Sequence, residues 1–429
     1  MISRPGTLLA ACLCLAAVCR GDDVTAETIR ITDRLPYGQS AVNYFSESVQ
    51  DPVARLNAQL QARTVILAPD SRHGFLKSVL HHLAVPQASQ LLVFSKTARA
   101  PELVSPATPR AVFFNDMVSV AWILDARELE LSAVDPTRGV NFYTLRQPQA
   151  DTPDESTAQF VRQDRCLACH AGTSSVEVPG LLLRGFQTDH TGKMLYGYSR
   201  LTHATAFDRR WGGWYVTGSP ARLIHRGNLI NQAENERHKD QPGFRSTLSS
   251  LAGRGDFRNW PASTSDFVAH LIFAHQVHGT NLLIRCGMEC RLNRYSDAQD
   301  RLLRYLVFAD EAALEIDRVE TRRLLRTPYA KWFQSMKVPS GQPDALRELQ
   351  LRDRVFRNRL SFLVNTPLFD GLPDEVRDRL LTRLWHGLTD DHPEKMFAHL
   401  EAAERKRIVQ FLLATKAGLP SPWPAVPDP

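Results

Sequence analysis

The chain has 429 residues and a formal net charge of +6, with 52 basic and 46 acidic residues. This length is enough for two domains or for one large core with additions. Basic and acidic residues alternate in the second half without a basic block or interleaved aromatic residues, so we expect no nucleic-acid partner.

The N-terminus has the pattern of a secretory signal peptide, which we place at residues 1–21. An apolar run over 7–18 follows Arg4 and is too short to span a bilayer. We expect cleavage near residues 19–21, which lowers the net charge from +6 to +4 by removing Arg4 and Arg20. A lipoprotein-like sequence that ends at Cys12 leaves a lipid anchor as the alternative. The pattern therefore predicts a periplasmic or otherwise exported protein, associated with a membrane only if it is lipidated.

Residues 22–150 are expected to form an α+β region. Asp51-Pro52 is typical of a helix start, and a second helical pattern covers 75–83. Strand patterns follow, and Asn115-Asp116 separates two of them as in a hairpin. The strand patterns cover 91–94, 111–114, 117–123, 129–133 and 140–145. They predict an antiparallel meander.

Residues 166–170, in an expected region of 151–262, read Cys-Leu-Ala-Cys-His. A zinc knuckle needs two further ligands nearby, and a thioredoxin-like pair needs a βαβ setting; the sequence offers neither context. In an exported chain this spacing predicts one covalently attached haem c, since no second such motif exists. Cys166 and Cys169 would be the thioether anchors, and His170 the proximal iron ligand.

After this motif, strand patterns cover 181–188 and 194–202, and residues 210–218 form an aromatic and glycine cluster. The region 263–419 is expected to be mainly helical, with a proline-rich tail at 420–429. Its helical patterns cover 266–285, 299–316, a segment opened by Pro373, and 401–416. The expected fold is therefore α+β, with a strand-rich N-terminal half, a mono-haem segment in mid-chain and a mainly α-helical C-terminal half.

Two further cysteines lie outside the leader and the motif, Cys286 and Cys290. An oxidising compartment would favour a local disulfide, while free thiols or a partial metal site remain alternatives. Their spacing is awkward inside a regular helix, and Gly287 suggests that the helix frays between them.

The chain resembles a set of uncharacterised exported bacterial proteins with a cytochrome-c-like domain. The resemblance rests on Phe94-Ser95-Lys96-Thr97, Ala133-Val134-Asp135-Pro136, the pentad at 166–170, residues 210–218 and Lys416-Ala417-Gly418-Leu419-Pro420. It implies haem binding and export, and it implies no particular reaction.

The sixth iron ligand separates the possible functions, because a strong second ligand favours electron transfer and an open site permits small-molecule chemistry. His275 is the first candidate, on the apolar face of the helix expected over 266–285, with His225 second and Met194 third. A buried histidine that is simply hydrogen-bonded within the protein is the alternative for each. Other candidates of the same types are Met288, His190, His203, His270 and His278.

Haem would also need apolar walls and partners for its propionates. The aromatic cluster offers Trp211, Trp214 and Tyr215 for the walls, and Arg210 of the cluster and Arg226 after it could pair with the propionates. For all five, ordinary packing or a solvated surface is the alternative.

Two functions from different classes follow from these features. The first is an exported mono-haem c-type cytochrome that transfers electrons to or from a redox partner protein or a small-molecule donor or acceptor. The second is a haem-c oxidoreductase or peroxidase that acts on a small molecule at an open sixth position. A haem-based sensor or a structural subunit is a third and lower possibility.

Overall fold

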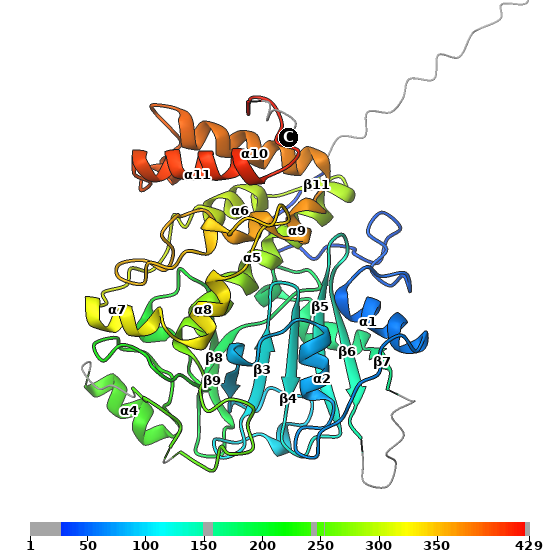
Figure 1. Cartoon of the computed structure of the whole chain (residues 1–429), viewed down its shortest axis with the longest axis vertical. Coiled ribbons are helices and arrows are strands. Elements are labelled where there is room, and N and C mark those ends of the chain that lie inside the picture. The colour runs from blue at the N-terminus through cyan, green and yellow to red at the C-terminus, as the bar shows by residue number, and fades with distance from the viewer. Residues whose placement is uncertain (1–26, 149–157, 242–246, 253, 425–429) are drawn as a thin grey trace, which may run out of the picture.

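The computed structural model describes residues 27–148, 158–241, 247–252 and 254–424 (Figure 1). The expected signal peptide at 1–21 lies outside these residues, as does nearly all of the polar segment after residue 148 and the end of the expected tail. The fold is α+β, as the sequence predicted, with a seven-stranded antiparallel sheet in the N-terminal half and helices in the C-terminal half.

The central sheet has the strand order β10-β2-β3-β4-β5-β6-β7. Six strands are consecutive in the chain. The first five form the expected meander, β7 extends it by a strand that the sequence did not predict, and β10 joins the β2 edge from the aromatic cluster. The strands are β2 (Leu91–Val93), β3 (Arg110–Phe114), β4 (Val118–Trp122), β5 (Glu128–Asp135), β6 (Gly139–Arg146), β7 (Phe160–Arg162) and β10 (Trp214–Tyr215). The expected region boundary near residue 150 therefore falls within one sheet.

Two helices cover one face of this sheet, α1 (Pro52–Gln61) and α2 (Leu76–His82) (Figure 1). Helix α1 begins as the sequence predicted, since the Asp51 carboxylate accepts a hydrogen bond from Ala54 N at 2.9 Å. Apolar residues of β4, such as Val118 and Val120, belong to the core cluster that these helices share with the sheet. The opposite face of β4, which carries Ser119 and Ala121, does not contact these two helices.

Helix α5 (Phe267–Arg291) crosses the middle of the molecule and is buried over nearly its whole length (Figure 1). The chain around it carries the hairpin β8 (Arg184–Thr188) with β9 (Met194–Arg200), and a parallel pair β1 (Glu27–Thr28) with β11 (Arg294–Tyr295). The remaining helices are α3 (Leu167–His170), α4 (Gln232–Asp240), α6 (Ala298–Leu306), α7 (Arg318–Leu324), α8 (Pro328–Gln334), α9 (Pro367–Asp370), α10 (Asp374–Thr389) and α11 (Ala402–Thr415). One of the two apolar clusters extends from Leu35 to Trp423 and includes residues of all the expected chain regions after the leader, while the other lies between the sheet and α1 and α2.

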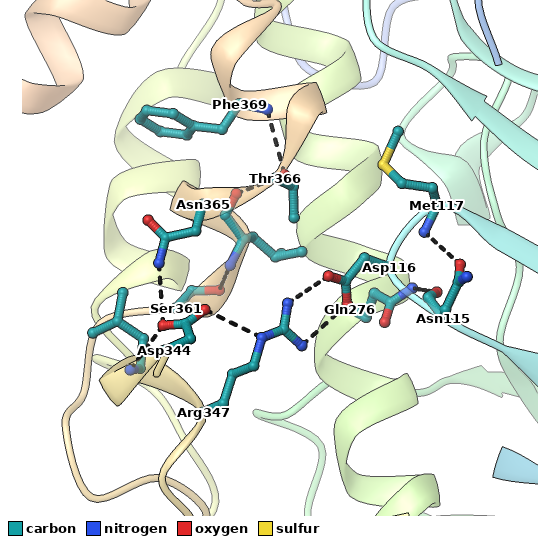
Figure 2. Close-up of polar contacts among 12 residues, drawn as sticks. Asn115, Asp116, Met117, Gln276, Asp344, Arg347, Ser361, Asn365, Thr366 and Phe369 are labelled. Carbon is teal, nitrogen blue, oxygen red and sulfur yellow. Dashed lines mark hydrogen bonds and ion pairs between the residues drawn. The ribbon is translucent and has the colours of Figure 1, made fainter. Parts of the chain in front are cut away.

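A buried ion-pair network ties the turn between β3 and β4 to the C-terminal half (Figure 2). The Arg347 guanidinium donates to both carboxylate oxygens of Asp116 and, at 3.2 Å, to Asp344 Oδ2. Nearby, Gln276 Nε2 on α5 donates to Asn115 O at 2.7 Å. The contacts of Arg347 with Asp116 and of Gln276 with Asn115 connect segments that are more than 150 positions apart in the chain.

Two helix predictions differ from the structure. The helix expected over 299–316 ends at Leu306, because the chain turns at Phe308, whose φ of 56° is left-handed and incompatible with a continuing α-helix. The helix expected over 266–285 instead continues to Arg291, so it does not fray at Gly287. Cys286 is buried in this helix, and both it and Cys290 are free thiols, so the structure does not contain the expected disulfide.

Among the described residues, no helix combines the length and the apolar character that crossing a bilayer requires.

Candidate functional site

A cavity of about 510 Å³ lies between the sheet face opposite α1 and α2 and the chain segment that contains the Cys-x-x-Cys-His pentad. Its volume lies within the range of roughly 300–1,000 Å³ that small-molecule and cofactor sites occupy. Both cysteines and the histidine of the pentad line it, and so does Phe273 of α5. The structure therefore brings the three residues of the predicted haem site to one wall of a ligand-sized space.

Small side chains on neighbouring strands form the floor of this cavity. Ser119 of β4 pairs with Ser132 of β5, and Ala121 of β4 lies between Val112 and Glu130. Successive residues of a strand point to opposite faces, so Ser119 and Ala121 face the cavity while Val118 and Val120 face the helices. The cavity is thus the volume that large apolar side chains at these positions would otherwise fill.

The pentad forms a single turn of helix, α3, that follows a 3₁₀ turn over Asp164–Cys166. Cys166 is half-buried and Cys169 is exposed, and both are free thiols. Burial raises the pKa of the Cys166 thiol. Because both thiols are free and line the cavity, the two sulfur atoms are available for thioether bonds at its edge.

One ring nitrogen of His170 is already committed to the protein. Nδ1 donates to the backbone oxygen of Gly180 at 3.0 Å, and the ring packs on Phe142 with a centroid separation of 4.5 Å. Burial lowers the pKa of His170 to about 4, so the imidazole is neutral near pH 7. With the proton on Nδ1, Nε2 carries the free lone pair and has no hydrogen-bond partner within the described part of the chain. This is the tautomer that iron coordination requires.

Four arginines and one carboxylate line the cavity, which gives it positive charge: Arg99, Arg110, Arg165, Arg184 and Glu130. Arg110 pairs with Glu130 at 3.4 Å, and Arg99 pairs with Glu128 at 3.2 Å. In the described part of the structure, Arg165 and Arg184 form no ion pair. Two cations therefore remain for anionic groups of a ligand.

Of the aromatic cluster, only Trp214 lines the cavity. Its Nε1 donates to Arg184 O at 2.9 Å, which links β10 to β8. Trp211 and Tyr215 are fully buried elsewhere in the core. Arg210 is buried and donates to the backbone oxygens of Thr205 and His203, so it is not at the cavity.

The structure does not bring His275 to the cavity. His275 is buried, with Nδ1 2.8 Å from His203 Nδ1 and Nε2 2.7 Å from Ser361 Oγ. Both nitrogens have partners within the protein, which was the alternative to iron coordination.

The other ligand candidates also lie away from the lining residues. His225 contacts Ser219 and Gly227, and His270 contacts Tyr215 O and Ser265. Met194 and His190 are exposed on the β8–β9 hairpin, Met288 is buried in α5, and His278 contacts the ring of Tyr305. The described lining of the cavity holds His170 as its one histidine and contains no methionine.

Sequence reasoning missed the cavity floor and the arginines that line the cavity. The signal for the floor was present in β4, where the small residues Ser119 and Ala121 alternate with larger apolar residues, a pattern that is equally typical of a strand with one solvent-exposed face. Arg165 directly precedes the pentad and could have been noticed there, whereas Arg99, Arg110 and Arg184 come from segments far from it in the chain, so no local spacing could have identified them.

The chain matches no protein-family model, no curated protein and no solved structure. Its function is therefore argued from the geometry of the site.

Proposed function

We propose that this chain is an exported mono-haem c-type protein, with haem bound through Cys166 and Cys169 and with His170 as the proximal ligand. The observation that carries the proposal is the state of His170 at the cavity wall. Its Nδ1 is held by Gly180 O, and its Nε2 is left to bind a metal. Two free thiols within one helical turn complete the set of groups that haem attachment needs.

The rest of the cavity fits the same cofactor. Phe142, Phe273 and Trp214 supply apolar surface for a porphyrin, and small floor residues leave space for a flat group. Arg165 and Arg184 are suited to the two propionates through charge-assisted hydrogen bonds. Bound there, haem would supply one-electron redox chemistry and a coordination position for small molecules.

Of the two functions that the sequence allowed, the site favours a haem-c oxidoreductase or peroxidase that acts on a small molecule. The sheet wall presents Ser119, Ala121 and Val112, none of which is a strong iron ligand, and His275 is engaged with His203 and Ser361. A sixth position left open to water is the condition for small-molecule chemistry. Electron transfer is the second candidate, and the exposure of Cys169 supports it because a thioether there would place the haem edge near the surface.

The attachment is tested by staining denaturing gels of the exported protein for haem peroxidase activity. A stained band is expected in the wild type and is expected to disappear in the Cys166→Ala, Cys169→Ala double variant. Haem that acidified organic solvent extracts from the wild type would contradict covalent attachment.

Absorption spectra of the reduced protein with and without carbon monoxide separate the two functions. A high-spin haem that binds carbon monoxide is expected for the open site. A six-coordinate low-spin haem that ignores carbon monoxide would instead favour electron transfer and would identify a ligand that moves into the cavity.

A further inference from the structure

Asn281 lies on α5 and is fully buried. Its side-chain amide forms two hydrogen bonds with the backbone of Leu181: Oδ1 accepts from Leu181 N at 2.8 Å, and Nδ2 donates to Leu181 O at 2.9 Å. One amide side chain of the central helix therefore holds the segment that forms the cavity wall next to His170.

The peptide group between Gly180 and Leu181 joins Asn281 to His170. Its N–H donates to Asn281 Oδ1, and its carbonyl oxygen accepts from His170 Nδ1 at 3.0 Å. The two hydrogen bonds share one planar group, so they form a continuous chain from α5 to the imidazole. Hydrogen bonds in such chains polarise each other, so the bond to Asn281 makes Gly180 O a better acceptor.

The close approach of Asn281 requires glycine at position 180. A Cβ atom on Gly180 would lie 2.5 Å from Asn281 Oδ1, which is closer than two such atoms can approach. Any larger residue would therefore displace the amide from the peptide group.

We propose that Asn281 is a positioning residue for the proximal ligand: through the 180–181 peptide it orients the His170 ring and increases the electron donation of Nε2. This inference rests on the proposed haem site. A partner that accepts the second ring N–H fixes the tautomer of a ligating histidine and raises its basicity. Here that partner is a backbone carbonyl, and Asn281 is the side chain that sets its position and polarity.

Two other contacts hold the same loop without touching the Leu181 N–H. Val140 N donates to Pro179 O at 3.1 Å, and Gly180 N donates to His170 O at 2.9 Å. The loop can therefore keep its path when Asn281 is replaced, so a change at the imidazole can be separated from unfolding.

The test compares Asn281→Leu with Gln276→Leu as the matched control. Gln276 is a buried amide on the same helix that also binds a backbone oxygen, but at the β3–β4 turn (Figure 2). Both variants are scored for covalent haem, midpoint potential and the iron–histidine stretching frequency of the reduced protein. With wild-type haem content, Asn281→Leu is expected to shift the potential to more positive values and to lower the frequency, while Gln276→Leu leaves both unchanged. Equal shifts in the two variants, or no shift in Asn281→Leu, would overturn the proposal.

Two more variants keep the test valid if Asn281→Leu does not fold. Gly180→Ala displaces the amide from the other side and is expected to give the same directions of change. Asn281→Asp is expected to stay closer to the wild type, because a protonated carboxyl group can accept from Leu181 N and donate to Leu181 O. We call the chain of hydrogen bonds from Asn281 through the 180–181 peptide to His170 the relay. Wild-type values in Gly180→Ala would contradict it. It would also be contradicted if the values of Asn281→Asp differed from the wild type as much as those of Gly180→Ala.

Failure of the haem assignment gives a different result. If the wild-type protein carries no covalent haem, the proposed function fails, and the relay is then read from the ¹⁵N spectrum of the His170 ring. The Nδ1–H tautomer is expected in the wild type, with a mixture of tautomers in Asn281→Leu. A wild-type tautomer in that variant would overturn the relay itself.

Discussion

His275 and His203 share a hydrogen bond between their Nδ1 atoms, at a separation of 2.8 Å in the core. Their rings are nearly coplanar, with planes 9° apart, and Tyr305 stacks on both. Since one Nδ1 must donate and the other accept, the pair is satisfied only while at least one ring is neutral. A second proton on this pair would leave two adjacent imidazolium ions in an apolar environment.

This arrangement predicts a protein that loses stability in mild acid. Burial lowers the pKa of His225, His270 and His275 to about 3, against an ordinary value of 6.5. Because the folded-state pKa is the lower one, the unfolded chain binds more protons, so this stability is present above pH 6.5 and is lost as the pH falls toward 3. Relative to pH 7.5, each such histidine is expected to lower the free energy of unfolding at pH 5 by roughly 2 kcal/mol.

Urea unfolding at pH 7.5 and pH 5 measures this effect. His275→Asn is expected to reduce the difference between the two pH values, whereas His392→Asn, at an exposed position, leaves it unchanged. Equal stability of the wild type at both pH values would show that these histidines are not buried as neutral rings.

The second prediction concerns the cavity floor. Ala121→Leu adds an apolar side chain to the space above β4, so it is expected to reduce covalent haem severalfold in the exported protein while the fold is retained. Val120→Leu changes the opposite face of the same strand and is expected to leave haem content unchanged. Haem content is measured by stained gels and by absorbance per polypeptide. Normal haem content in Ala121→Leu would place the cofactor elsewhere.

The sequence predicted the fold class, the meander and the helix starts at Asp51 and Asp266 because these features depend on local residue patterns. It failed at 307–316, where no glycine or proline marks the end of α6 and tertiary packing sets the turn at Phe308. Helix α5 is buried on almost all sides, so its apolar face could not show where His275 points.

The candidate site also contains residues that the sequence pattern identifies and residues that only tertiary packing brings together. Cys166, Cys169 and His170 are neighbours in the sequence and could be identified from spacing alone. Gly180 and Asn281 are 101 positions apart and meet only because α5 packs on the cavity wall, so no pattern in the chain connects them.

The third prediction is that Arg347 is essential for the connection between the sheet and the C-terminal half (Figure 2). Arg347→Met leaves Asp116 and Asp344 without their cation, and breaking a buried pair in this way costs roughly 3–5 kcal/mol. Arg357→Met removes the exposed pair with Glu348 and is expected to cost less than about 1 kcal/mol. Urea unfolding of both variants at pH 7.5 makes the comparison, and equal losses would contradict the role given to Arg347.

The last prediction concerns the two cavity arginines that have no ion pair in the described structure, Arg165 and Arg184. Each places positive charge where the propionates of a bound haem would lie, and positive charge favours the reduced state, which carries one positive charge less. Arg165→Ala and Arg184→Ala are therefore expected to lower the midpoint potential of the haem, and the double variant to lower it further. Arg258→Ala is the control, because Arg258 is exposed, pairs with Asp256 and does not line the cavity.

Potentiometric titration at two ionic strengths completes this test. Partly buried charges are screened less by salt than exposed ones. The shift in Arg184→Ala is therefore expected to persist when the salt concentration is raised, whereas the shift in Arg165→Ala, at an exposed position, is expected to shrink. An unchanged potential in both single variants, or a shift of the same size in Arg258→Ala, would show that Arg165 and Arg184 do not face the haem. Covalent haem measured on the same samples separates this outcome from a failure of attachment, because the thioether bonds depend on Cys166 and Cys169 and not on these arginines.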